Sequence, residues 1–275
     1  MGYDTLILSG GAIKGVALLG SFKYLLDHKL IKSNELKHII GASVGALFAL
    51  PFLLNINIDI FYHIIKKANI DIINKDNFNI QNLFNNFGFT ENNIVEKYVN
   101  VLIKNILKKS SLTLKELYEL SNIKFTVKVS NITKNKVEYI NHENYPNLDL
   151  SLLIKMTTCV PLVFKPVKFN NCLYCDGAIG GGLPIEYNTS ENYLGINLNN
   201  TTLDRKFKEE NKDIFDYTLN VMYIFYKSND FYFYKKLKNI IVIDLKIKDL
   251  KFHANNDEKE KLFIEGYKQT KNFFN

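Results

Sequence analysis

A serine between two glycines is the residue of this chain best suited to act as a nucleophile. The segment GASVG at residues 41–45 follows a short apolar run at 37–40 and precedes an apolar stretch with helical spacing. G-x-S-x-G between a strand and a helix is typical of a nucleophile elbow, a sharp turn that lifts a serine hydroxyl above a sheet. Gly41 and Gly45 suit this turn because a Cβ at either position would crowd it. We therefore predict Ser43 as a nucleophile for acyl transfer.

A glycine-rich loop precedes the elbow by one predicted strand and one predicted helix. The apolar run 3–8 ends in the segment SGGAIKG at residues 9–15. Backbone N–H groups of such a loop can bind the oxyanion of a tetrahedral acyl intermediate. The predicted donors of this oxyanion hole are Gly10, Gly11, Ala12 and Gly15. Lys14 adds a positive charge, either for a phosphate headgroup or for solvent, and the sequence does not decide between them.

The same loop does not fit the nucleotide-binding alternatives. A P-loop needs Lys and then Ser or Thr around its last glycine, whereas Val16 and Ala17 follow Gly15 here. A dinucleotide loop would carry glycine at Ala12 and an acid at the end of the next strand. That strand ends instead at Ser43, so we expect no nucleotide cofactor.

A serine hydroxyl needs a base, and the sequence offers two. Asp176 ends the apolar run 172–175, which places it at a strand end. A Ser–Asp dyad would use this carboxylate directly, with desolvation raising its pKa toward the working pH. A triad would add His253, which lies where the order Ser, Asp, His places the imidazole. Asp-Gly is also a common turn pair, which is the structural alternative for Asp176.

Taken together, these motifs resemble those of the patatin-like phospholipases, which are lipid acyl hydrolases with a Ser–Asp dyad. The resemblance rests on the glycine-rich loop, the elbow, Asp176 with Gly177 and Ala178, and the segment 157–166, and it spans residues 6 to about 184. It implies that Ser43 is the nucleophile and Asp176 the proton acceptor, and it favours the dyad over a triad with His253. The chain departs from the family at two positions. Ala12 replaces a loop glycine, and Gly182 stands where the family often has asparagine.

The elements that must position these residues alternate between strands and helices. This order predicts an α/β fold with a mostly parallel central sheet, and the resemblance implies three layers with helices on both faces. We expect a single patatin-like domain over residues 1–275, with a loosely matched helical segment at about 55–122 and C-terminal helices at 213–275 covering the sheet. The predicted strands lie at 3–8, 37–40, 123–131, 136–141, 163–170, 172–175, 193–198 and 240–245. The predicted helices lie at 15–28, 44–54, 58–68, 91–107, 114–120, 150–158, 213–236 and 257–274.

Three features of the sequence leave alternatives open. The segment 74–89 is rich in Asn and Phe, and it suits either a lid whose apolar side chains face lipid or a surface loop. The aromatic helix predicted at 213–236 suits a cover for the sheet better than a membrane contact. Cys172 and Cys175 have metal-ligand spacing, but no second Cys or His pair complements them, so we expect apolar filling of a strand and no metal site.

Composition limits the class of protein. The 275 residues carry a formal net charge of +7, with 35 Lys and Arg against 28 Asp and Glu. This balance suits an anionic membrane surface or nucleic acid, and it is also that of an ordinary solvated surface. No nucleic-acid module is present, and we expect no nucleic-acid partner. Neither a signal peptide nor a stretch long enough to span a bilayer is apparent. We therefore expect a cytoplasmic protein with possible peripheral membrane contact, and its oligomeric state is undetermined.

These observations predict a lipid acyl hydrolase of the phospholipase A type that forms an acyl-enzyme on Ser43. Two alternatives keep the same fold. One is an esterase or thioesterase that uses the same dyad on small soluble acyl substrates. The other is a lipid-binding module without catalysis, which the Ala12 departure would explain. We expect no cofactor in any of the three.

Overall fold

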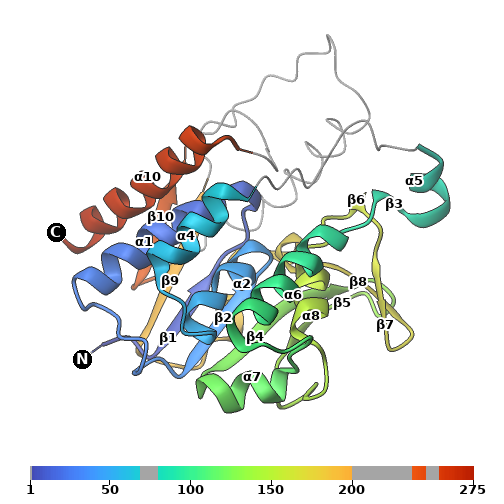
Figure 1. The fold of residues 1–275 in the computed structure, drawn as a ribbon, viewed down its shortest axis with the longest axis horizontal. Coiled ribbons are helices and arrows are strands. Elements are labelled where there is room, and N and C mark those ends of the chain that lie inside the picture. Colours follow the sequence, from blue (N-terminus) through green and yellow to red (C-terminus); the bar gives the residue numbers. More distant parts are fainter. Residues whose placement is uncertain (1, 69–79, 200–236, 246–253) are drawn as a thin grey trace, which may run out of the picture.

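The chain folds around an eight-stranded, mostly parallel sheet (Figure 1). This computed structural model describes residues 2–68, 80–199, 237–245 and 254–275. The strand order is β10-β9-β1-β2-β4-β8-β7, and β5 also pairs with β4. The strands from β10 to β4 are parallel to one another, whereas β5, β8 and β7 join as antiparallel neighbours. The strands of the main sheet are β1 (Thr5–Leu8), β2 (His38–Ala42), β4 (Lys124–Asn131), β5 (Lys136–Ile140), β7 (Val167–Phe169), β8 (Cys172–Asp176), β9 (Tyr193–Asn199) and β10 (Ile240–Asp244).

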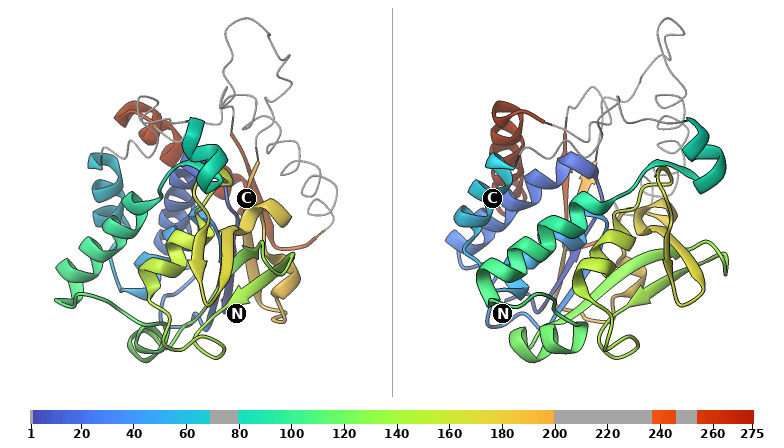
Figure 2. Two further views of the ribbon diagram at one scale, coloured as in Figure 1. Left: turned by 90° about the vertical axis from the view of Figure 1, so that its right-hand side faces the viewer. Right: turned by 45° about the vertical axis from the view of Figure 1, so that its right-hand side comes forward.

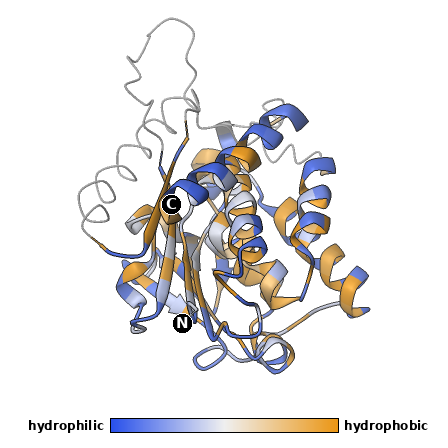
Figure 3. Ribbon diagram, turned by 90° about the vertical axis from the view of Figure 1, so that its left-hand side faces the viewer, coloured by the Kyte–Doolittle hydropathy of each residue, from blue (hydrophilic) through white to orange (hydrophobic). Residues whose placement is uncertain are grey.

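The two faces of the sheet have different cores, because alternate residues of a strand point to opposite sides. In β1, Leu6 and Leu8 join the large cluster formed with the helices, whereas Ile7 joins a smaller cluster on the other face. Leu183 covers that smaller cluster. Figure 2 shows the described helices gathered along the sheet, and Figure 3 shows the central strands mostly in the colour of apolar residues. The helices are α1 (Val16–Asp27), α2 (Val44–Phe48), α3 (Leu50–Leu53), α4 (Ile58–Lys67), α5 (Ile80–Asn86), α6 (Asn93–Leu107), α7 (Leu114–Ser121), α8 (Leu150–Thr157) and α10 (Asn256–Phe274).

Two predicted elements are broken at prolines. The helix expected at 44–54 is divided into α2 and α3, because Pro51 has no N–H with which to continue the hydrogen-bond ladder. The strand expected at 163–170 is divided into β6 (Leu162–Phe164) and β7, and Pro166 lies between them. Asn170 and Asn171, both at positive φ, form the turn that joins β7 to β8.

A second, small sheet was not predicted. β3 (Gly88–Thr90) pairs in parallel with β6, and α5 immediately precedes β3 (Figure 1). Part of the segment 74–89 is therefore a helix and a strand. The rest of it lies outside the described residues, as does the whole of the predicted aromatic helix at 213–236.

Candidate active site

The elbow after β2 holds Ser43 in a backbone conformation that side chains rarely adopt. Its φ is 50° and its ψ is −125°, between the end of β2 and the first residue of α2. A Cβ at Gly41 would lie 2.8 Å from the Ala46 backbone, and one at Gly45 would lie 2.5 Å from the Leu8 carbonyl oxygen. Glycine is therefore required on both sides of the serine for steric reasons, as the sequence predicted. Such a strained residue persists only where its surroundings hold it in place.

Asp176 lies at the same edge of the sheet as Ser43, but its strand, β8, runs in the opposite direction. β4 continues three residues past its last β2 partner, and β8 pairs antiparallel with that extension. Asp176 lies opposite Val129, while the preceding residue Lys128 lies opposite Ala42, which directly precedes Ser43. The two candidate residues are thus brought together by an antiparallel strand, whereas the sequence predicted only that each lies at the end of a strand.

The side chains of Ser43 and Asp176 are in direct contact. The Ser43 hydroxyl donates a hydrogen bond to Asp176 Oδ2 at 2.6 Å, and the Ala178 N–H donates to Oδ1 at 2.7 Å. Ser43 is 6% exposed and Asp176 is 4% exposed. Burial raises the pKa of the Asp176 carboxyl from 3.8 to about 6, and the hydrogen bonds from Ser43 and Ala178 oppose that rise. A carboxylate with such a pKa is a better proton acceptor than an exposed one.

The backbone of the elbow is held by a threonine relay. The Ser43 N–H donates to Thr157 Oγ1 at 2.8 Å, and the Thr157 hydroxyl donates in turn to the Lys128 carbonyl oxygen at 2.7 Å. Thr157 is the last residue of α8 and is fully buried. This relay joins α8, β4 and the elbow at one point, which fixes the position of the serine independently of its own side chain.

The glycine-rich loop after β1 contacts both halves of this pair. A Cβ at Gly10 would lie 3.2 Å from Ser43 Cβ and 2.7 Å from Ala178 Cβ. The Gly10 N–H donates to the Gly182 carbonyl oxygen at 3.0 Å, so this donor is engaged within the protein. The 3-10 helix η1 (Ala12–Gly15) begins two residues later. The first N–H groups of a helix have no acceptor within it, which favours Gly11 and Ala12 as oxyanion donors.

The remaining residues of the loop have packing roles. A Cβ at Gly15 would lie 2.4 Å from a methyl group of Val44, so this glycine lets η1 pack against α2. Ala12 has a φ of 50°, a conformation that costs alanine about 1–2 kcal/mol relative to glycine. Lys14 is buried within η1. Gly177 lies against β4, where a Cβ would lie 2.0 Å from the Lys128 carbonyl oxygen.

Lys128 is a supporting residue that the sequence analysis missed. Its fully buried ammonium group donates to the carbonyl oxygens of Gly180 (3.2 Å) and Gly181 (3.0 Å) and pairs with Glu186 at 2.6 Å. These contacts fix the segment that follows Asp176, including the carbonyl that binds Gly10. The sequence carried no signal for this role, because Lys128 shares the polar face of the alternating strand with Lys124, Thr126 and Ser130.

The cysteines and His38 are not part of the Ser43–Asp176 contact, although the Cys159 carbonyl oxygen accepts a hydrogen bond from the Asp176 N–H. Cys159, Cys172 and Cys175 are buried free thiols, and burial raises the pKa of Cys175 to about 12. Within the described ranges, no three potential metal ligands converge. His38 is the first residue of β2 and lies at the opposite end of that strand from Ser43. Its imidazole shares a hydrogen bond with the Thr126 hydroxyl, and burial lowers its pKa to about 4. His253 lies outside the described residues.

The chain is similar to known proteins over most of its length. The family model for patatin-like phospholipase matches residues 6–188, which include the glycine-rich loop, the elbow and Asp176. The chain belongs to the patatin-like phospholipase family. It is 30% identical over 265 residues to a probable lipid hydrolase of Invertebrate iridescent virus 6, covering 94% of this chain and 84% of the viral protein. It is also 25% identical over 282 residues to an uncharacterized protein of Acanthamoeba polyphaga mimivirus, covering 97% and 92% of the two chains.

Solved structures of similar shape support the same α/β fold. VipD of Legionella pneumophila aligns with a TM-score of 0.67 at 16% identity, covering 99% of this chain and 66% of VipD. The type III effector ExoU of Pseudomonas aeruginosa aligns with a TM-score of 0.56 at 10% identity, covering 99% of this chain and 52% of ExoU. This patatin-like chain therefore spans about two thirds of VipD and half of ExoU. The predicted family and fold class are confirmed, whereas a single domain over 1–275 stays a prediction because the family match ends at residue 188.

None of the helices in the described part of this patatin-like chain is both long and apolar enough to cross a bilayer.

Proposed function

We propose that this patatin-like protein is a phospholipase A-type lipid acyl hydrolase with a catalytic dyad of Ser43 and Asp176. The observation that carries the proposal is the 2.6 Å hydrogen bond from the Ser43 hydroxyl to a buried carboxylate. A serine hydroxyl is a weak nucleophile until a base takes its proton, and this carboxylate is the base in contact with it.

In the first half of the reaction, Ser43 Oγ attacks the carbonyl carbon of a fatty-acyl ester while its proton passes to Asp176 Oδ2. The negative charge moves to the carbonyl oxygen, where the N–H groups of Gly11 and Ala12 stabilise it. The ester C–O bond then breaks. The proton on Asp176 moves to the leaving alcohol, which departs as the lysolipid and leaves the acyl group on Ser43.

The second half repeats these steps with water. Asp176 takes a proton from a water molecule, whose oxygen attacks the acyl carbon, and the tetrahedral intermediate collapses to release the fatty acid. Ser43 regains the proton from Asp176. The raised pKa suits this double role, because the same carboxyl must accept a proton and then return it. No metal or cofactor takes part in this scheme.

The substrate class follows from the family and from the relative named as a probable lipid hydrolase. Membrane phospholipid is the substrate we propose. Small soluble esters are the alternative for the same dyad. An enzyme that acts at a lipid surface gains activity when its substrate is presented in vesicles, so the two substrates are distinguished by the physical state of the ester.

The test is a product analysis on phospholipids of defined acyl composition. We expect release of fatty acid by the unmodified protein, and a loss of at least about a thousandfold in kcat for Ser43→Ala and for Asp176→Ala. His253→Ala serves as the control for a triad and should retain activity. Full activity in Asp176→Ala would rule out the dyad, and turnover of soluble esters without any gain on vesicles would favour the alternative substrate.

A further inference from the structure

Three large apolar side chains are exposed together at the small sheet. Phe84 of α5 is 75% exposed, Phe87 at the start of β3 is 62% exposed, and Leu162 of β6 is 41% exposed. Gly88, which follows Phe87, pairs with Leu162 in the β3–β6 ladder. Figure 1 shows α5, β3 and β6 side by side, projecting from the body of the protein. We call Phe84, Phe87 and Leu162 the apolar tip.

Two residues of the apolar tip are held in a left-handed backbone conformation. The φ of Phe87 is 61° and that of Leu162 is 63°. This conformation is unfavourable for bulky residues, at about 1–2 kcal/mol each, and glycine would avoid the cost. These two side chains therefore strain the backbone while a large part of each stays exposed to solvent. Strained residues of this kind commonly mark functional segments.

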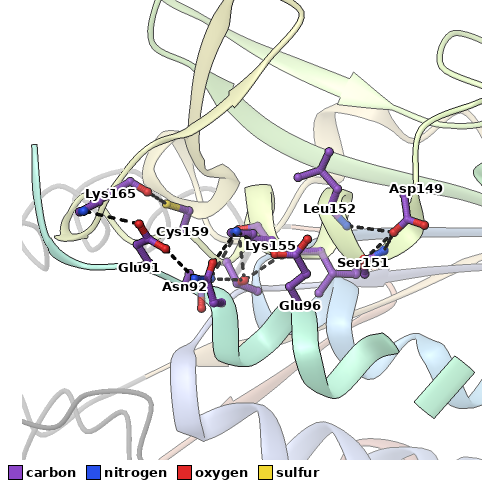
Figure 4. Close-up of polar contacts among 12 residues, drawn as sticks. Glu91, Asn92, Glu96, Asp149, Ser151, Leu152, Lys155, Cys159 and Lys165 are labelled. Carbon is purple, nitrogen blue, oxygen red and sulfur yellow. Dashed lines mark hydrogen bonds and ion pairs between the residues drawn. The ribbon is translucent and has the colours of Figure 1, made fainter. Parts of the chain in front are cut away.

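The base of the apolar tip is fixed to the body by polar contacts (Figure 4). The Lys165 N–H donates to the Thr90 carbonyl oxygen at 2.8 Å, and its ammonium group pairs with Glu91 at 3.5 Å. The Cys159 thiol donates to the Lys165 carbonyl oxygen at 3.0 Å. Lys155 of α8 pairs with Glu96 of α6 at 2.8 Å. The exposed side chains are thus carried on an anchored support.

This support leads directly to the candidate active site. The Cys159 carbonyl oxygen accepts a hydrogen bond from the Asp176 N–H at 2.8 Å. Leu162 follows Cys159 by three residues, so their Cα atoms are separated by at most about 11 Å. Asn92, which follows β3, donates to Thr158 Oγ1 at 2.9 Å, next to the threonine that binds the Ser43 N–H. The apolar tip and the dyad therefore share one rim of the protein.

The charges around the apolar tip indicate what it contacts. The sequence from Ile80 to Thr90 and from Thr157 to Phe164 contains no charged residue, although 23% of the chain is charged. Glu91 follows the first uncharged stretch and pairs with Lys165, which follows the second, and Lys168 lies on the exposed face of β7. Uncharged apolar and aromatic side chains with lysines behind them match a lipid surface, whose acyl region is apolar and whose headgroups carry phosphate.

We propose that the apolar tip inserts into the surface of a phospholipid membrane and holds the rim of Ser43 and Asp176 against it. This inference rests on the proposed function, because it names the surface from which that site takes its substrate. A docked tip lets an acyl ester move from the bilayer to the dyad across a short path that excludes water. Docking of this kind does not itself require a membrane-spanning helix.

The experiment measures binding apart from turnover. Ser43→Ala protein is sedimented with vesicles of phosphatidylcholine, alone and in an equimolar mixture with phosphatidylglycerol. The tip variant adds Phe84→Ser, Phe87→Gly and Leu162→Gly. The matched control adds Ile60→Ser, Leu120→Ser and Ile264→Ser, which remove similarly exposed side chains from α4, α7 and α10. We expect the tip variant to lose about tenfold or more in partitioning onto both vesicles, and the control to bind like the parent. Thermal unfolding of each variant confirms that it is folded.

The outcomes separate this inference from the proposed function. Equal vesicle binding by the tip variant and its parent would overturn docking, whatever the hydrolysis assay shows. Loss of binding in the tip variant would support docking even if the unmodified protein, which retains Ser43, released no fatty acid. The parent protein could also dimerise without lipid while the tip variant stays monomeric. That result would show that the apolar tip binds a second copy of the chain, and it would overturn the proposal. In the active protein, docking predicts that the ratio of turnover on vesicles to turnover on a soluble ester falls with the tip variant.

Discussion

Ser43 and Leu162 both have a positive φ, in opposite surroundings. Their φ angles are 50° and 63°. Ser43 is buried between two glycines, its N–H is bound by Thr157, and its hydroxyl is bound by Asp176. Leu162 is exposed, and its strand is held only along one edge by β3. Both residues therefore carry backbone strain, one in a closed site and one at the surface.

The difference lies in what compensates for the strain. At the elbow, close packing on all sides leaves Ser43 a single conformation, and the cost of the site is mainly electrostatic because a carboxylate is buried there. At the apolar tip, pairing and polar contacts fix the base while the side chain stays in solvent. A substitution at the elbow should therefore change chemistry and stability together, whereas one at the tip should separate them.

The largest expected effect is that of Asp176→Asn. The raised pKa means that ionisation of Asp176 costs more in the folded state, so its contribution to stability falls as the pH rises from about 4 to about 6. The asparagine variant lacks this loss. We expect its free energy of unfolding at about pH 8 to exceed that of the unmodified protein by up to about 3 kcal/mol, with no difference near pH 4. Urea unfolding at the two pH values measures this.

Activity should show the opposite dependence on pH. The dyad needs the ionised carboxylate, so kcat for a soluble ester should rise through a pKa of about 6 and then level off. Asp176→Asn should be inactive throughout. An asparagine variant with the same stability as the unmodified protein at both pH values would show that the carboxyl is not desolvated, which would remove the electrostatic half of the comparison.

Lys128→Met tests the support of the site at an intermediate level. The variant removes the lysine donor of the carbonyl oxygens of Gly180 and Gly181, while Glu186 keeps the hydrogen bond from the Tyr139 hydroxyl. We expect a loss of about 1–3 kcal/mol in the free energy of unfolding. We also expect kcat for a soluble ester to fall about tenfold with KM unchanged, because the segment after Asp176 shifts.

Lys124→Met on the same strand is the matched control for Lys128→Met. The Lys124 ammonium group pairs with Glu143 at the surface, and exposed pairs contribute about 0–1 kcal/mol. An unchanged kcat in Lys128→Met would show that the elbow and Asp176 are positioned without this buried lysine.

The smallest expected effect is that of Leu162→Gly, and its sign is opposite. Glycine adopts a φ of 63° without strain, so we expect the free energy of unfolding to rise by about 0.5–1 kcal/mol after the entropy cost of glycine is included. Leu120→Gly in α7 is the control, because glycine within a helix should destabilise by about 1 kcal/mol. Both values are accessible from urea titrations. Destabilisation by Leu162→Gly would show that the leucine side chain contributes packing energy, contrary to the proposed role of the tip.

The family and most of the elements were predictable because they depend on local rules. Glycine spacing around Ser43 reflects the steric demands of a turn, and Thr113 with Glu116 marks the start of α7 through a capping box that the structure contains. The breaks at Pro51 and Pro166 follow from the missing N–H of proline and were missed because the apolar pattern continues across them. The pairing of β3 with β6 was not predictable, since the two strands are remote in sequence and three residues long.

By itself, the sequence determined which residues are chemically capable of acyl transfer and the local turns that present them. Only the tertiary structure decided that Asp176 approaches Ser43 on an antiparallel strand and that Lys128 is buried against the segment after Asp176. It also decided that the strained residues of the apolar tip lie on the same rim as the dyad. The physical reason is range. Turn geometry depends on neighbouring residues, whereas hydrogen-bonded register, burial and the pKa of a carboxyl depend on segments more than a hundred residues apart that meet only in the folded chain.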